Sequence, residues 1–141
     1  MHTPDLPFRW TPALLVLLLT AGTAAADIWV ITDSRHPVTG IRMPDRVIEL
    51  DAAQRIKAKL SEQLPGDPQR ATTIIQQRLQ QEGPALQQMH DAYQGLTDAW
   101  SLGITTIPAV VVDQRYVLYG ESDLDKALAR VEQHRSEEKQ P

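Results

Sequence analysis

The last third of the chain carries its most restrictive pattern. Pro108 precedes the run Ala109-Val110-Val111-Val112, whose composition is typical of a strand that is buried on both faces. Residues 113–115 separate this run from Tyr116-Val117-Leu118-Tyr119, and a gap of that length predicts a hairpin. The apolar residues that follow recur every three or four positions and predict a final helix: Leu124, Ala127, Leu128 and Val131. The chain therefore ends as an α/β protein in which a proline-led strand, a hairpin and a helix share one core.

The rest of the chain supplies two further strands and a long helical stretch. Short runs rich in β-branched residues predict strands over 28–32 and 46–50, with a loop between them. Proline and glycine at 65–66 and 83–84 then divide residues 51–103 into three predicted helices. The third helix carries apolar residues at spacings of three and four, and we expect them to pack in the core: Leu86, Met89, Tyr93, Leu96 and Trp100. The alternative is that Tyr93 and Trp100 form an aromatic binding surface. We also expect Trp29 to lie in the core, and His90-Asp91 to lie on a solvated helix face.

This order of elements is similar to that of the thioredoxin-like fold. Two strands, a helical insertion, a proline-led strand, a hairpin strand and a helix predict a central mixed sheet of about four strands. The helical insertion is larger than a minimal thioredoxin needs. In that fold a cis-proline opens the third strand, so Ile107-Pro108 is the candidate cis bond. We assign residues 27–135 to this domain and residues 136–141 to a disordered polar tail.

The segment after the first strand supports the same alignment. Periplasmic disulfide isomerases of the thioredoxin superfamily carry a Thr-Asp-x-x-Cys-Pro-x-Cys type segment there, and this chain carries Thr32-Asp33-Ser34-Arg35-His36-Pro37-Val38-Thr39. His36 and Thr39 stand where that motif has its two cysteines. The 141 residues contain no cysteine at all. Thiol–disulfide exchange requires a thiolate, so the sequence excludes it.

Residues 1–26 predict a cleaved secretory signal peptide. Arg9 precedes the apolar run Ala13-Leu14-Leu15-Val16-Leu17-Leu18-Leu19, and Ala24-Ala25-Ala26 provides a small-residue cleavage site. The alternative is an uncleaved membrane anchor, for which the uncharged span is at the lower limit of length. Cleavage predicts a periplasmic protein with no stable membrane insertion.

Several segments of the mature chain together resemble the integrating conjugative element protein family. The resemblance is carried by Trp29-Val30-Ile31-Thr32-Asp33, His36-Pro37, Val47-Ile48-Glu49-Leu50-Asp51, Tyr93-Gln94-Gly95, Asp98-Ala99-Trp100-Ser101-Leu102-Gly103-Ile104, Ile107-Pro108-Ala109-Val110-Val111-Val112-Asp113 and Tyr116-Val117-Leu118-Tyr119-Gly120. It implies an exported component of a conjugative transfer (type IV secretion) apparatus, with protein components of that apparatus as partners. It implies no known reaction and no catalytic residue.

The fold analogy points to one candidate binding site. The residues before the proline of a thioredoxin-like fold form an exposed backbone edge that can pair with an extended peptide. The predicted groove combines this edge with the loop after the first strand: His36, Pro37, Thr105, Thr106, Ile107 and Pro108. The alternative is a turn that only begins the strand.

We expect a binding or assembly protein and not an enzyme. His36 beside Asp33 offers a general base for a hydrolase as a weaker alternative, and a chaperone that holds an unfolded pilus or channel subunit is another. We expect no catalytic residue, no cofactor and no metal site, because neither a nucleophile motif nor a histidine cluster with ligand spacing is present. The net charge of −4 argues against a nucleic-acid partner.

Overall fold

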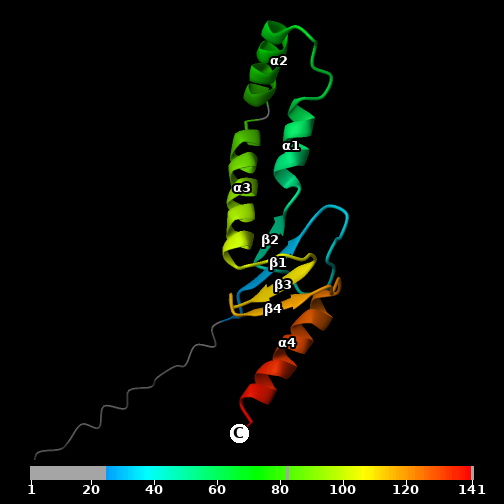
Figure 1. Cartoon of the computed structure of the whole chain (residues 1–141), viewed down its shortest axis with the longest axis vertical. Coiled ribbons are helices and arrows are strands. Elements are labelled where there is room, and N and C mark those ends of the chain that lie inside the picture. The colour runs from blue at the N-terminus through cyan, green and yellow to red at the C-terminus, as the bar shows by residue number, and fades with distance from the viewer. Residues whose placement is uncertain (1–24, 82, 141) are drawn as a thin grey trace, which may run out of the picture.

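Four short strands form one mixed sheet in the computed structural model, which describes residues 25–81 and 83–140. In chain order the elements are β1 (Ile28–Thr32), β2 (Arg46–Glu49), α1 (Ala52–Leu60), α2 (Pro68–Gln81), α3 (Ala85–Ser101), β3 (Ala109–Val112), β4 (Tyr116–Tyr119) and α4 (Leu124–Glu138). The strand order in the sheet is β2-β1-β3-β4, with β1 parallel to β2 and the other two pairs antiparallel. The predicted α/β, thioredoxin-like fold is confirmed (Figure 1).

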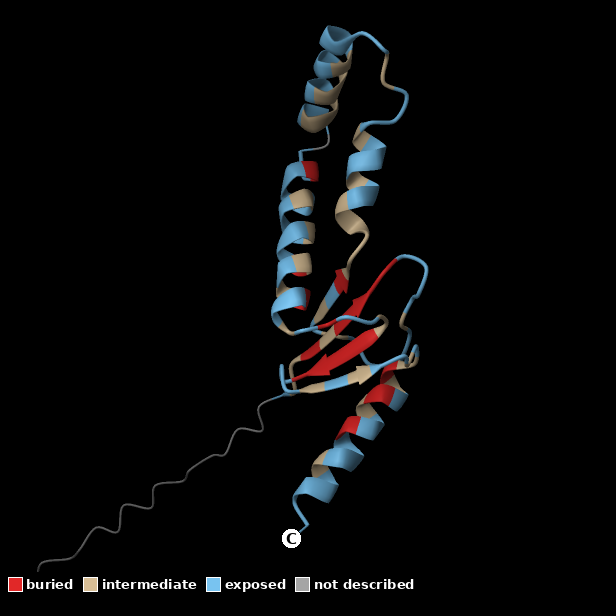
Figure 2. Ribbon diagram, in the orientation of Figure 1, coloured by how far each residue is buried: buried red, intermediate tan, exposed pale blue. Residues whose placement is uncertain are grey.

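The two faces of the sheet bury separate apolar clusters, because successive side chains of a strand point to opposite faces. On one face, α4 packs on β3 and β4 and contributes Leu124, Ala127 and Val131. On the other face, α3 packs on β2, and Ala99 meets Ile31 and Ile48. Buried residues concentrate in β1, in β3 and in the turns of α3 and α4 nearest the sheet (Figure 2).

A loop, and not a helix, connects the parallel strands β1 and β2. It spans residues 33–45 and is fastened to the start of α4, where Thr39 N–H donates to Ser122 O and Leu124 N–H donates to Thr39 O. The Asp125 carboxylate accepts the backbone N–H groups of Ile41 and Arg42. Hydrogen bonds to the backbone of Ser122 and Leu124 and to the side chain of Asp125 therefore hold this loop at the start of α4.

The predicted enlarged helical insertion is present, and it extends away from the sheet as an arm of three helices (Figure 1). Neither α1 nor α2 contains a buried residue, whereas α3 buries Ala85, Gly95 and Ala99. Gly95 permits the close approach of α3 to the sheet, because a Cβ at this position would lie 3.1 Å from Ile48 Cγ2.

The expected core positions on α3 are corrected by the structure. Trp100 is 70% exposed and Tyr93 is 54% exposed, and Leu86 is exposed as well. These three residues recur every seven positions, so they share one flank of the apolar stripe. The sheet covers the side of α3 that carries its small residues, and α1, which ends at Leu60, covers only part of the remaining stripe.

The segment from residue 136, which the sequence assigns to a disordered polar tail, begins inside helix α4. Helix α4 continues to Glu138, because tertiary contacts hold its last turns to the β3–β4 hairpin. Arg135 pairs with Asp113 and stacks over the Tyr116 ring at 4.7 Å, and the Tyr116 hydroxyl donates to Glu138 at 2.8 Å. The predicted signal peptide spans residues 1–26, and residues 1–24 of it lie outside the described residues.

Candidate functional site

The two halves of the predicted groove meet at one end of the sheet. The antiparallel ladder of β1 and β3 ends with the pair Ile31 and Ala109, so the next residues along the two strands are Thr32 and Pro108. The loop that leaves β1 therefore begins beside the segment that enters β3. The Ile107–Pro108 peptide bond is cis, as the fold predicted.

Asp33 organises the loop that follows β1. Asp33 is only 5% exposed, and its Oδ1 accepts the backbone N–H groups of Arg35 and His36, each at 3.0 Å. Oδ1 also lies 2.7 Å from His36 Nδ1, and Oδ2 accepts from Arg35 Nη2 at 3.1 Å. Burial alone would raise the pKa of Asp33, but the hydrogen bonds from His36 and Arg35 outweigh it and hold the pKa at about 2. The carboxylate is therefore ionised throughout the physiological range.

The Asp33 carboxylate orients the His36 ring through Nδ1, so that Nε2 is the ring nitrogen that a ligand can contact. The side chain of His36 is 52% exposed, and its carbonyl oxygen accepts the Thr32 hydroxyl. An imidazole held in this way can accept a proton at Nε2 or donate a hydrogen bond to a bound group. The nearby Ser34 hydroxyl donates to Asp51 and not to His36, so it does not form a nucleophile–base pair with this ring.

Asp51 joins this loop to the helical arm. It is the N-cap residue of α1, yet its side chain caps nothing there and instead accepts the backbone N–H of Ser34 at 3.1 Å. The Ser34 hydroxyl and the backbone N–H, together with Arg55, hold the pKa of Asp51 below its usual value. The side chain of this N-cap residue therefore fastens the site loop and not the helix.

The segment before Pro108 keeps an open backbone edge. Thr105 and Thr106 are exposed, while Ile107 and Pro108 are half-buried. Gly120 N–H donates to Pro108 O at 2.8 Å, and Ile107 packs against the cluster around Ile48. Within residues 25–81 and 83–140, no hydrogen bond reaches Thr105 or Thr106, and none joins this segment to the His36 loop. The structure thus brings the predicted residues to one end of the sheet.

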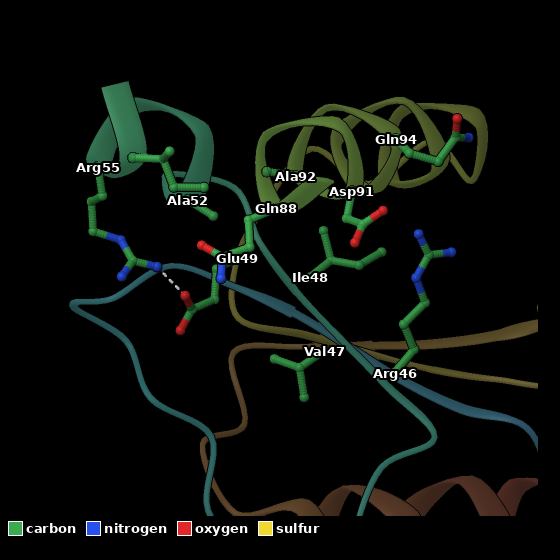
Figure 3. Close-up of a pocket in the computed structure, with 12 residues that line it drawn as sticks. Arg46, Val47, Ile48, Glu49, Ala52, Arg55, Gln88, Asp91, Ala92 and Gln94 are labelled. Atoms are coloured by element: carbon green, nitrogen blue, oxygen red, sulfur yellow. Dashed lines mark hydrogen bonds and ion pairs between the residues drawn. The ribbon is translucent and has the colours of Figure 1, made fainter. Parts of the chain in front are cut away.

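The structure also shows a cleft that the sequence did not predict, at the β2 edge of the sheet. It measures about 720 Å³ and lies between β2, α1 and α3 (Figure 3). Its walls are formed by Arg46, Val47, Ile48, Glu49, Ala52, Arg55, Ile56, Gln88, Asp91, Ala92, Gln94 and Gly95. The small residues of α3 at 92 and 95 were the only local signal, and they do not reveal which elements meet there.

The charges of this cleft are mostly neutralised by neighbours. Arg46 pairs with Asp98 at 2.6 Å and lies 4.8 Å from the centre of the Trp29 ring. Arg55 pairs with Glu49 and with Asp51. Trp29 is half-buried against the second apolar cluster, and its indole N–H donates to Asp27. Trp29 therefore packs at the margin of the core and not, as the sequence predicts, in its interior.

The described part of the chain contains neither a cluster of metal ligands nor a helix suited to span a membrane. No group of three or more histidine, aspartate or glutamate side chains there is placed to hold a metal ion. His90 and Asp91 are both exposed, as predicted, and Asp91 also lines the cleft. None of the helices within the described ranges combines the length and the hydrophobicity that crossing a membrane requires.

Comparison with known proteins gives one assignment. No curated protein and no solved structure shows significant similarity to this chain. Residues 25–137 match the family described as "Protein of unknown function (DUF1525)", and this match includes every strand and all but the last residue of the helices. The chain therefore belongs to the DUF1525 family.

Proposed function

We propose that this protein is a non-redox, thioredoxin-like component of a conjugative transfer (type IV secretion) apparatus and acts in the periplasm by binding or assembling its protein partners. The sequence resemblance to integrating conjugative element proteins and the predicted signal peptide support this setting. The absence of cysteine supports a role without disulfide exchange.

One observation carries the binding role. Thr105 and Thr106 are exposed, no hydrogen bond of the described chain reaches them, and they precede Pro108 at the sheet end where the His36 loop leaves β1. An exposed segment of this kind can pair with an extended peptide by strand addition, while neighbouring side chains select the sequence. A partner segment would lie between this edge and the His36-Pro37 loop.

Mating assays test the proposal. Deletion of the gene should lower the transfer frequency of its element at least tenfold, and the wild-type gene should restore it. Thr106→Lys places a long charged side chain on the open edge and should fail to restore transfer. Thr73→Lys makes the same change at an exposed position of α2 and should restore it. Normal transfer after deletion would contradict the conjugation role, and normal transfer with Thr106→Lys would contradict the groove.

Site-specific photocrosslinking tests the partner. A photoreactive residue at Thr105 should capture a protein of the transfer apparatus in the periplasm, whereas the same residue at Thr73 should not. Capture of an unfolded pilus or channel subunit, in place of a folded component, would favour the chaperone function.

The His36–Asp33 hydrogen bond favours one second candidate, a hydrolase that uses His36 as a general base. In that case His36→Ala would abolish transfer while the protein still folds. His36→Gln keeps a hydrogen-bonding side chain without a titrating ring, so it would restore transfer only if His36 acts in binding.

A further inference from the structure

The cleft beside β2 lies against a free edge of the sheet, and α1 and α3 border it. β2 is an outermost strand, and apart from its ladder with β1 no hydrogen bond from the described residues reaches its backbone. An edge strand presents unpaired N–H and C=O groups at the spacing that an added strand requires. The other outermost strand, β4, contributes Tyr116 to a hollow that lies against the end of α4. The position of β2 therefore makes it a surface for strand addition that is separate from the His36 edge.

The two faces of this edge differ in chemistry. Ile48 points toward α3 and is buried, whereas Val47 points to the opposite face and is 55% exposed (Figure 3). In a strand added beside β2, alternate side chains would lie next to Val47 on one face and beneath α3 on the other. An apolar residue matches the first position, because it would cover the exposed Val47.

Among the described residues, one charged group in the cleft has no oppositely charged partner. Asp91 accepts a hydrogen bond from Gln87 Nε2 at 2.8 Å, and no cation of the described chain forms an ion pair with it. Figure 3 shows its carboxylate directed from α3 toward the space above Ile48, between Arg46 at one end and the Arg55–Glu49 pair at the other. A lysine or arginine beneath α3 could lay its aliphatic stem over Ile48 and Ala92 and place its charge at Asp91.

We propose that the β2 edge binds an extended segment of a partner protein in which apolar residues alternate with basic residues, the apolar ones against Val47 and a basic one at Asp91. The backbone pairing supplies affinity for any extended segment, and Asp91 selects the charge. This surface does not rely on the function proposed for the His36 edge.

The probes are two fluorescent nine-residue peptides with blocked ends, one alternating valine with lysine and the other alternating valine with glutamate. Anisotropy titration of the purified protein should show that the lysine peptide binds at least tenfold more tightly. Amide resonances of Arg46–Glu49 should shift on binding, and those of β4 should not. Equal binding of the two peptides, or shifts confined to β4 or to residues 105–106, would overturn the proposal.

Variants locate the contact. Asp91→Lys should lower the affinity for the lysine peptide at least fivefold and raise the affinity for the glutamate peptide. Glu137→Lys makes the same charge change at the end of α4 and should alter neither affinity. Gln88→Trp places a large ring in the cleft from an exposed helix position and should abolish binding. Unchanged binding in both cleft variants would refute the proposal. A concentration-dependent dimer that Gln88→Trp dissociates would show that a second copy occupies the edge instead.

Discussion

His36 Nδ1 lies 2.7 Å from Asp33 Oδ1, and the same carboxylate oxygen accepts the backbone N–H of His36. The side chain and the backbone of His36 are therefore fixed by one buried group. Replacement of that group should change both the stability of the loop and its response to pH.

Asp33→Asn should lower the free energy of unfolding at neutral pH, because the amide replaces a charged acceptor. The pKa of Asp33 falls from 3.8 to about 2 on folding, so its stabilising effect is complete above pH 4 and is lost as the pH falls from about 4 to 2. Urea unfolding between pH 7 and pH 2.5 should show a difference from wild type that is constant at higher pH and shrinks in this window. Asp91→Asn, at an exposed carboxylate, should change stability by no more than about 0.5 kcal/mol. A difference that grows below pH 4 would contradict the assigned role of Asp33.

Gly95→Ala should destabilise the protein by about 1 kcal/mol. Alanine favours a helix by about 1 kcal/mol over glycine, but a crowded core position costs about 1–3 kcal/mol. The new Cβ would lie 3.1 Å from Ile48 Cγ2. Gly66→Ala, at a position with open space around it, should be neutral or stabilising. Thermal unfolding of both variants checks this prediction, and a higher melting temperature for Gly95→Ala would refute it.

Trp100→Ala should leave the free energy of unfolding within about 0.5 kcal/mol of wild type, because 70% of the residue is exposed. Ile31→Ala is the contrasting variant: Ile31 is fully buried, and its truncation should cost about 2–5 kcal/mol. Chemical denaturation compares the two. A loss above about 2 kcal/mol for Trp100→Ala would place this side chain in a packed environment.

Arg135→Gln should destabilise the protein by about 1 kcal/mol and increase amide exchange over residues 132–138 about tenfold. It removes the ion pair with Asp113 and the stacking over Tyr116 that hold the end of α4. Arg130→Gln is the control, because its side chain is more exposed and its pair with Glu121 spans 3.9 Å. Unchanged exchange at the end of α4 in Arg135→Gln would show that this helix end does not depend on the hairpin.

Local sequence signals were sufficient for the order of elements. Apolar spacing identified each helix and strand, and prolines and glycines separated them, because these signals act within a few residues. The positions of Tyr93 and Trp100 could not be inferred in this way. Periodicity places both on the apolar side of α3, but the width of the covered stripe depends on α1, which is a separate helix. The end of α4 likewise depends on Asp113 and Tyr116 in the hairpin.

The candidate site was predictable only in part. The identity of the groove residues followed from their positions before and after strands that the fold makes neighbours. The side-chain role of Asp51 and the cleft around Asp91 were not predictable, since each joins elements that are distant in the sequence. No residue pattern within a single element indicates such a junction.

The loop after β1 also determines what a restored thiol could do. Reactive cysteines acquire a low pKa at a helix N-terminus or beside a cation. Residue 36 lies in a loop and beside the Asp33 carboxylate, which would disfavour a thiolate. A chain with cysteines reintroduced at positions 36 and 39 would therefore carry a weakly reactive thiol pair. The loop backbone and the Asp33 carboxylate, and not only the absence of cysteine, would therefore disfavour dithiol chemistry at these positions.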